Sequence, residues 1–356
     1  MRTESVARPN FSSNEEFGYH MRKHFPYFSM KERQGSAYLD SAASALKLDV
    51  CVERMSRYLA YEHANVHRGA YELSMAASEN YSLGREAVRS FCKVPSSHEV
   101  IFTSGATESL NVVARGLEES FRRSRKPILT TLLEHHSNFI PWQQLAQQTG
   151  APFLVAGINS EAEIHLSDFY THLKQGRPRI AAFTAMSNAF GTITPVKELV
   201  EACREVGCIS VVDATQSVVH GKLSVEELGA DFIVFSAHKL YGPTGLGVLI
   251  GRKNLLDELE PSTFGGGMIG EVTVERTTWA DIPARFEAGT PPIAEVISFT
   301  DTLEKLTNLH ADNDVGEAER TLYEYAVEKL SRCTGVELIG PVERDQESII
   351  SFLVNG

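Results

Sequence analysis

Lys239 has the sequence setting that points most directly to chemistry. It lies in the segment FSAHKLYGPTG (235–245), where it follows a very apolar run and precedes a glycine-rich turn. Most lysines are solvated surface residues, but burial at the end of a strand lowers the pKa of the amine and makes it a nucleophile for a carbonyl carbon. The segment therefore favours Lys239 as a lysine that forms a Schiff base.

Asp213 supplies a negative charge at the end of a second apolar run. The run is ISVVDATQS (209–217), and Gln216 follows the aspartate by about one helical turn. An aspartate in this position is often only the cap of the next helix. A pyridoxal phosphate (PLP) site also needs a buried carboxylate, which pairs with the pyridine nitrogen so that the ring can accept electrons. Asp213 and Lys239, on consecutive strands, supply both poles of that cofactor.

A third strand end has the features of a phosphate site. In IFTSGATESLN (101–111) a strand is followed by a Ser-Gly-Ala-Thr turn and a helix start. Free N–H groups at a helix N-terminus, the helix dipole and the Thr107 hydroxyl form a phosphate cradle, although an ordinary capped helix fits the same stretch. The nearby Gly245-Leu246-Gly247 is followed by an apolar strand rather than a helix, so we expect no nicotinamide site.

Two adjacent histidines follow a fourth strand. They are His135 and His136 in LLEHHSNFIPW (132–142). Neighbouring histidines point in different directions and make a poor metal pair, so we expect no metal; one of them can instead lie flat on a cofactor ring. The four segments together are far more specific for a PLP site than any one of them alone.

The elements that must position these residues alternate from about Leu39 onward. Helix-period segments at 78–91, 107–121, 142–149 and 197–206 are interleaved with apolar runs at 100–103, 127–131, 152–156, 180–184, 209–213, 231–236 and 247–250. Such runs are typical of buried parallel strands joined by helical crossovers, so we expect an open α/β sheet covered on both faces. Ligands bind at the C-terminal strand ends of such sheets.

The last part of the chain predicts a smaller lobe. Two helical segments at 294–309 and 315–331 precede short strands at 336–339 and 348–354. The final apolar strand has no obvious partner, and an α+β lobe usually needs three or more elements to bury its face. We therefore expect this lobe to be incomplete.

Composition and charge exclude several protein classes. The 356 residues are 42% hydrophobic and 22% charged, which is typical of a globular protein, and the net charge of −12 disfavours nucleic acid and membrane partners. The N-terminus lacks an apolar signal core and no run reaches about 18 apolar residues, so we expect a cytoplasmic protein. Five cysteines without C-x-x-C spacing argue against a disulfide framework and a metal site.

At this point the sequence resembles the class V aminotransferase family of fold type I PLP enzymes, and within it the SUF-type cysteine desulfurase/selenocysteine lyase group. The motifs that carry the resemblance are YLDSAAS (38–44), NVHRGAYELS (65–74), TSGATESLN (103–111), EHHSNFIPWQ (134–143), MSNAFGT (186–192), VVDATQS (211–217), SAHKLYGPTG (236–245), GGGMI (265–269) and RFEAGTPP (285–292). They cover most of the chain.

The resemblance implies a role for individual residues. Lys239 is implied to bind the cofactor covalently, Asp213 to pair with the pyridine nitrogen, and His135 to stack on the ring and serve as an acid–base group. The other implied positions are Gln216 at the ring O3′, Asn188 beside ring and substrate, the Ala106 backbone with Thr107, Ser236 and His238 at the phosphate, Thr290 at the phosphate of a second subunit, and His67 and Arg68 beside the substrate. The Thr290 match implies a homodimer.

The sequence also departs from the family pattern. Ala237 replaces a usual Gly, DATQS replaces the common D-G-A-Q, and Gly267 replaces a usual Glu. The family's C-terminal R-x-G-x-H-C segment holds an arginine for the substrate carboxylate and the thiol that takes the sulfur, and nothing after Ser348 resembles it. Cys333 stands in a different context, CTGVELIG, and is not expected to be that nucleophile.

Together these observations predict an α/β protein of fold type I, similar to aspartate aminotransferase. We expect a large PLP-binding domain at 36–293 and a smaller, incomplete α+β lobe from residues 1–35 and 294–356. The expected function is PLP-dependent release of sulfur from L-cysteine, or of selenium from selenocysteine, to give alanine. The alternatives are a class V aminotransferase, another PLP lyase, or a PLP-binding protein without desulfurase turnover. Expected partners are the amino acid substrate, a second copy and a sulfur-acceptor protein.

Overall fold

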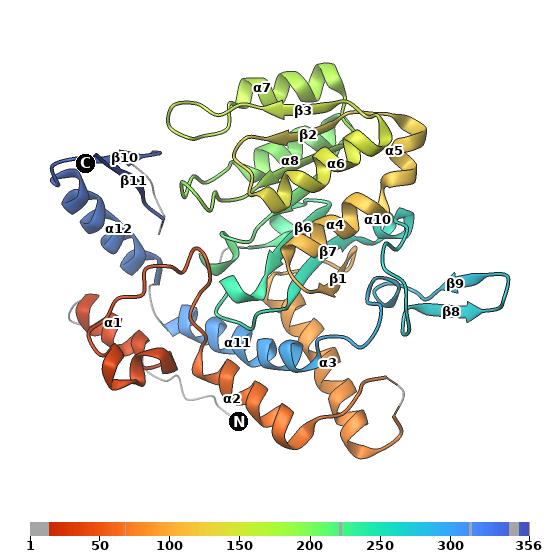
Figure 1. Ribbon diagram of the computed structural model, residues 1–356, viewed down its shortest axis with the longest axis horizontal. Helices are drawn as coiled ribbons and strands as arrows, with labels where there is room; N and C mark the ends of the chain where they lie inside the picture. The colour runs from red at the N-terminus through yellow and green to blue at the C-terminus, as the bar shows by residue number, and fades with distance from the viewer. Residues whose placement is uncertain (1–13, 68, 221–222, 313–314, 342–348, 356) are drawn as a thin grey trace.

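A seven-stranded sheet forms the centre of the protein (Figure 1). The computed structural model describes residues 14–67, 69–220, 223–312, 315–341 and 349–355. The strand order is β1 (His98–Thr103), β7 (Gly247–Arg252), β6 (Phe232–Ser236), β5 (Ile209–Asp213), β4 (Ile180–Thr184), β2 (Ile128–Thr131) and β3 (Phe153–Ala156). All seven expected strands are therefore present, within two residues of the predicted bounds, and the predicted α/β sheet is confirmed.

The direction of β7 differs from the prediction. Strands β3, β2, β4, β5 and β6 run parallel, whereas β7 is antiparallel to both β6 and β1. The connection 237–246 between β6 and β7 holds only a short 3₁₀ turn, and a parallel pairing would need a crossover of a dozen or more residues. The prediction of parallel strands was therefore wrong for β7, which lies between β6 and the edge strand β1.

Both faces of the sheet are buried, because alternate residues of each strand enter different apolar clusters. On β5, Val212 belongs to a cluster that includes residues of α3 (Glu72–Phe91), α8 (Val196–Glu205) and α11 (Ile293–Asp312). Its neighbour Val211 belongs to a second cluster with α4 (Ala106–Gly116) and α6 (Ile140–Thr149). The apolar runs of the central strands are continuous because these strands have no solvent-facing side.

Shorter elements complete this layer. They are α2 (Asp49–Arg57), which packs with α3 against α11, and α5 (Glu118–Ser124), α7 (Leu166–Thr171), α9 (Val225–Leu228) and α10 (Lys253–Glu258). The predicted helix 107–121 is divided, because α4 ends at Gly116 and α5 begins at Glu118. The hairpin β8 (Ile269–Val272) and β9 (Thr277–Trp279) projects from the body (Figure 1) and was not predicted.

The terminal elements lie on the opposite side of the molecule from this hairpin (Figure 1). They are α1 (Asn14–Arg22), α12 (Val315–Ser331), β10 (Val336–Ile339) and β11 (Ser351–Val354). Strand β11 pairs antiparallel with β10, so the expectation that the last strand lacks a partner was wrong. None of the helices that the structure describes combines the length and apolar character needed to cross a membrane.

Candidate active site

A cavity of about 230 Å³ opens at the C-terminal ends of β4, β5 and β6. Its wall also includes the first turn of α4 and the segment after β2. The lining residues are Ala43, Ala106, Thr107, His135, Ser137, Thr184, Met186, Asn188, Asp213, Thr215, Gln216, Ser236, His238 and Lys239. The structure thus brings together the residues predicted for the PLP ring, its phosphate and the Schiff base.

Lys239 reaches the cavity because β6 carries it there. All five residues of β6 are buried, and a 3₁₀ turn over Ala237–Lys239 follows directly. The Lys239 amine donates a hydrogen bond to the carbonyl oxygen of Ala42. Burial lowers the pKa of Lys239, and the nearby carboxylates of Asp213 and Asp40 only partly oppose that change. The amine is therefore tuned towards the neutral, nucleophilic form.

Asp213 lies at the buried end of the neighbouring strand β5. Its side chain is held by the Thr215 N–H, which donates to Oδ1 over 3.0 Å. Burial raises the pKa of Asp213, whereas hydrogen bonding by Thr215 and the charges of His135 and Lys239 lower it. A carboxylate in this low-dielectric setting gains most from a protonated ring nitrogen as its partner.

The N-terminus of α4 lines one end of the cavity. The Ala106 N–H donates to the Ser236 hydroxyl over 2.8 Å, and the hydroxyls of Thr107 and Ser137 lie 2.7 Å apart. A Cβ on Gly247, at the start of β7, would lie 2.4 Å from Cα of Gly105, so only glycine lets β7 approach this turn. Hydroxyls and free N–H groups at a helix N-terminus bind phosphate well.

The histidines of the site differ in their environment. Nδ1 of His135 accepts a hydrogen bond from the Ser137 N–H over 3.1 Å, so the ring proton of the neutral form is on Nε2. Burial, with the charges of Lys239 and Lys47, lowers the pKa of His238 to about 4. His238 is therefore neutral at physiological pH, with Nδ1 3.2 Å from the Ser44 hydroxyl.

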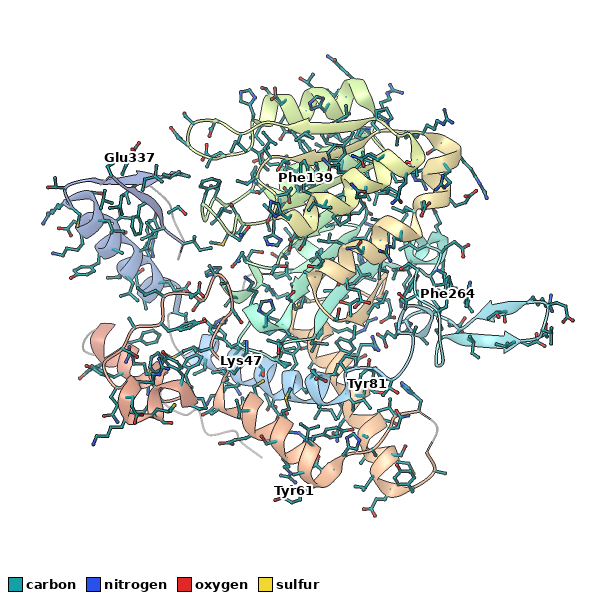
Figure 2. All side chains as sticks on the ribbon, in the orientation of Figure 1. Lys47, Tyr61, Tyr81, Phe139, Phe264 and Glu337 are labelled. Atoms are coloured by element: carbon teal, nitrogen blue, oxygen red, sulfur yellow. The ribbon has the colours of Figure 1, made fainter. Side chains whose placement is uncertain are left out.

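Loop 42–48 closes one side of the site. Besides the Lys239 amine, the side-chain amide of Gln216 donates to the Ala42 carbonyl, over 2.9 Å. The Lys47 amine, labelled in Figure 2, donates to the carbonyl oxygens of Ala45 and His238. The loop thus holds the turn that carries Lys239 in place.

Two of the predicted positions that the structure describes do not line the cavity. Thr290 is exposed beyond 3₁₀ helix 284–286, and the ring of His67 packs edge-on against Tyr81 at 5.9 Å. Arg68 lies outside the described residues. Five lining residues were not singled out from the sequence, namely Ala43, Ser137, Thr184, Met186 and Thr215. Ser137 and Thr215 lie inside the quoted motifs, so their position beside His135 and Asp213 was the signal that could have found them.

The donor set fits PLP. A helix N-terminus with hydroxyls can bind the phosphate, a buried carboxylate can face the ring nitrogen, and a lysine with a lowered pKa can bind the aldehyde carbon, all around one cavity. No group of three or more His, Cys, Asp and Glu side chains suited to a metal ion occurs among the described residues.

Known proteins are similar to this chain in sequence. The chain is 38% identical over 341 residues to a cysteine desulfurase of Synechococcus elongatus, a match that covers 95% of this chain and 54% of that protein. It is also 38% identical over 328 residues to a probable cysteine desulfurase of Halalkalibacterium halodurans, covering 92% and 80% of the two chains. The chain thus spans about half the length of the first relative and most of the second.

Solved structures confirm the predicted fold class. The apo cysteine desulfurase of Thermococcus onnurineus superposes with a TM-score of 0.87 at 33% identity, covering 99% of this chain and 84% of that one. The cysteine desulfurase CsdA of Escherichia coli superposes with a TM-score of 0.80 at 32% identity, covering 97% and 83%.

The family assignment rests on a match to most of the chain. The model of the class V aminotransferase family matches residues 37–356, which include every strand of the sheet and every residue of the cavity. The resemblance carried by the motifs is therefore confirmed, and the chain belongs to the class V aminotransferases, a family of PLP-dependent enzymes.

Proposed function

We propose that this protein is a PLP-dependent enzyme that removes sulfur from L-cysteine and passes it to a thiol, which gives alanine and a persulfide. The observation that carries the proposal is the meeting of Lys239 and Asp213, on consecutive strands, in one cavity that ends at the N-terminus of α4. The similarity to proteins named cysteine desulfurases supports the substrate.

PLP, when bound, supplies an electron-accepting ring that stabilises negative charge at the substrate Cα. Lys239 would hold the cofactor through its amine and, as a neutral base, would move the proton at the substrate Cα. Asp213 would keep the proton on the ring nitrogen, and His135 would cover the ring. The hydroxyls of Thr107 and Ser236, with the N-terminus of α4 at Ala106, would bind the phosphate and fix the orientation of the ring.

The cysteines of the described residues favour a second candidate. Cys51, Cys92, Cys203 and Cys208 are buried, and the exposed Cys333 donates from its thiol to the Lys329 carbonyl at the end of α12. None of these five lines the cavity. A desulfurase needs a thiol to take the sulfur, whereas selenium leaves with less assistance than sulfur. Release of selenium from selenocysteine is therefore the alternative reaction.

Product analysis separates these functions. Purified protein is incubated with PLP, a thiol reductant and either L-cysteine or L-selenocysteine, and alanine, sulfide, oxo acid and pyridoxamine phosphate are measured. Desulfuration predicts alanine and sulfide in equal amounts from cysteine. Alanine from selenocysteine but not from cysteine supports the lyase. An oxo acid formed together with pyridoxamine phosphate supports an aminotransferase. No alanine from either substrate contradicts both proposals.

The lowered pKa of Lys239 predicts a pH profile. Because only the neutral amine attacks the aldehyde, the rate of PLP attachment to apoprotein should rise with pH, with a midpoint below the ordinary lysine value of about 10.4. Stopped-flow absorbance measures this rate. The charge of Asp40 raises the pKa of Lys239, so Asp40→Asn should move the midpoint lower still. A midpoint at or above the ordinary value contradicts the assignment.

We also propose a homodimer in which Thr290 contacts the phosphate in the partner's site. Thr290 is exposed and outside its own cavity, while the segment before it is anchored by the partly buried ion pair of Glu287 with Arg85, 2.8 Å long. Sedimentation should show a dimer. A protein that remains monomeric with stoichiometric PLP contradicts this proposal.

A mixed dimer tests the position of Thr290 more directly. Lys239→Ala and Thr290→Ala chains are combined, and PLP affinity is measured. If Thr290 serves the partner, one site of the mixed dimer regains both wild-type residues and wild-type affinity. If each Thr290 serves its own chain, every site in the mixture remains altered. Recovery therefore supports the exchange of Thr290 between subunits, and its failure excludes it.

The cellular setting follows from the proposed activity. We propose a cytoplasmic enzyme that passes sulfur to an acceptor protein, as in iron–sulfur cluster assembly. We also propose that residues 36–293 form the PLP-binding domain and that residues 1–35 and 294–356 form the smaller lobe. Both proposals depend on the reaction described above.

A further inference from the structure

Glu134 connects the ends of two strands behind the cavity. Its Oε1 accepts from the Thr131 hydroxyl of β2 over 2.8 Å and from the Thr184 N–H of β4 over 3.0 Å. Its Oε2 accepts from the side-chain amide of Asn138 over 2.5 Å. One carboxylate therefore binds three donors from three segments of the chain.

The partners of Glu134 are held as donors by bonds of their own. The Thr131 hydroxyl accepts from the Leu133 N–H over 3.1 Å and therefore directs its proton to Glu134. Oδ1 of Asn138 accepts from Nε1 of the fully buried Trp142 over 3.0 Å, which fixes the amide so that Nδ2 faces Glu134. Every group that contacts the carboxylate thus donates, and none accepts.

The hydrogen bonds around Glu134 connect to two residues that line the cavity. His135 is bonded covalently to Glu134, and its carbonyl oxygen accepts from the Asn138 N–H over 2.8 Å, which closes the turn that holds the imidazole. Thr184 is itself a lining residue. Burial, with the charge of Asp213, raises the pKa of Glu134 to about 8, although its three donors oppose that change. Because all three contacts donate to Glu134 and none accepts from it, the geometry matches the carboxylate rather than the protonated acid.

We propose that Glu134 is a positioning residue that, through Asn138 and Thr184, fixes His135 against the cofactor ring. This inference rests on the proposed function, because His135 is the residue that is proposed to cover the ring. It does not depend on the identity of the amino acid substrate. Glu134 itself does not line the cavity and takes no part in the reaction.

Exchanging the carboxylate of Glu134 and the side-chain amide of Asn138 tests this geometry. Glu134→Gln keeps the shape but places an NH₂ either against Asn138 or against the donors Thr131 and Thr184. We expect PLP affinity to fall roughly tenfold, the cost of leaving a buried donor unpaired, and the visible circular dichroism of the bound cofactor to change.

The double variant Glu134→Gln with Asn138→Asp restores the complementarity. The Gln amide then donates to the new carboxylate, which still accepts from Trp142, while the Gln oxygen accepts from Thr131 and Thr184. We expect PLP affinity within about threefold of the wild type and the original circular dichroism. The single variant Asn138→Asp places its carboxylate against that of Glu134. We expect it to lose PLP affinity as Glu134→Gln does.

A stability control separates positioning from folding. Thr149→Val removes a buried hydroxyl of α6 that donates to the Leu145 carbonyl over 2.7 Å, away from Glu134. It should lower the melting temperature without changing PLP affinity or circular dichroism. Wild-type PLP binding by Glu134→Gln, failure of the double variant to recover, or an equal effect of Thr149→Val would each overturn the proposal. Because every readout is cofactor binding, a failure to release alanine would contradict the proposed function alone.

Discussion

Lys239→Ala is expected to abolish covalent attachment of PLP and to lower the rate of alanine formation by a factor on the order of 10²–10⁴, the usual contribution of a catalytic acid–base group. The amine of Lys239 lines the cavity and has a lowered pKa, so its loss removes both the attachment point and the group that moves the Cα proton. Absorbance of the bound cofactor and alanine release measure the two effects.

Lys47 provides the matched control for this change. It is the other lysine held against the turn 237–239, and burial also lowers its pKa, but it does not line the cavity. Lys47→Ala should loosen the contact of loop 42–48 with the turn 237–239. PLP should still attach covalently to this variant. Attachment that survives Lys239→Ala and disappears in Lys47→Ala would show that the wrong lysine has been assigned.

Asp213→Asn is expected to preserve the fold, weaken PLP binding and slow proton exchange at the substrate Cα by about a hundredfold or more. The amide has the same shape and can still accept from the Thr215 N–H, but it carries no charge to hold a proton on the ring nitrogen. Exchange of the Cα proton for deuterium, followed by NMR, measures the chemical step without depending on sulfur release.

Asp231→Asn tests whether this effect is specific to the site. Asp231 precedes β6 at the other end of the sheet, where it accepts from the Ser210 N–H and pairs with Arg252, both over 2.9 Å. Its substitution should reduce stability and leave Cα exchange unchanged. Comparable losses of exchange in both variants would mean that Asp213 acts through folding rather than through the ring.

The strand ends were predictable because their signals are local. The bounds of β4 and β5 follow from apolar runs that are buried on both faces, and the polar residue that ends each run must lie at the ligand-binding edge. Residue type and spacing are therefore enough to place Lys239 and Asp213 together. The reversed direction of β7 was harder to predict, because it depends on the absence of a crossover helix in 237–246.

Non-local contacts explain what sequence analysis missed. The sequence shows that Glu134 precedes His135, but it does not show the partners of the Glu134 side chain. The hydrogen bond that Glu134 accepts from the Thr184 N–H joins residues 50 positions apart and forms only once β2 pairs with β4. The pairing of β11 with β10 is likewise a tertiary fact, as is the exposure of Thr290. Their signals lie in the fold rather than in residue type or periodicity.

The site of cofactor attachment is the most direct test of the central claim. PLP-loaded protein is reduced with borohydride and digested, and the modified peptide is identified by mass spectrometry. The account predicts that the adduct is on Lys239 and that Lys239→Ala yields no modified peptide. An adduct on Lys47 or any other lysine would contradict the assignment of the cavity, and with it the function proposed for this protein.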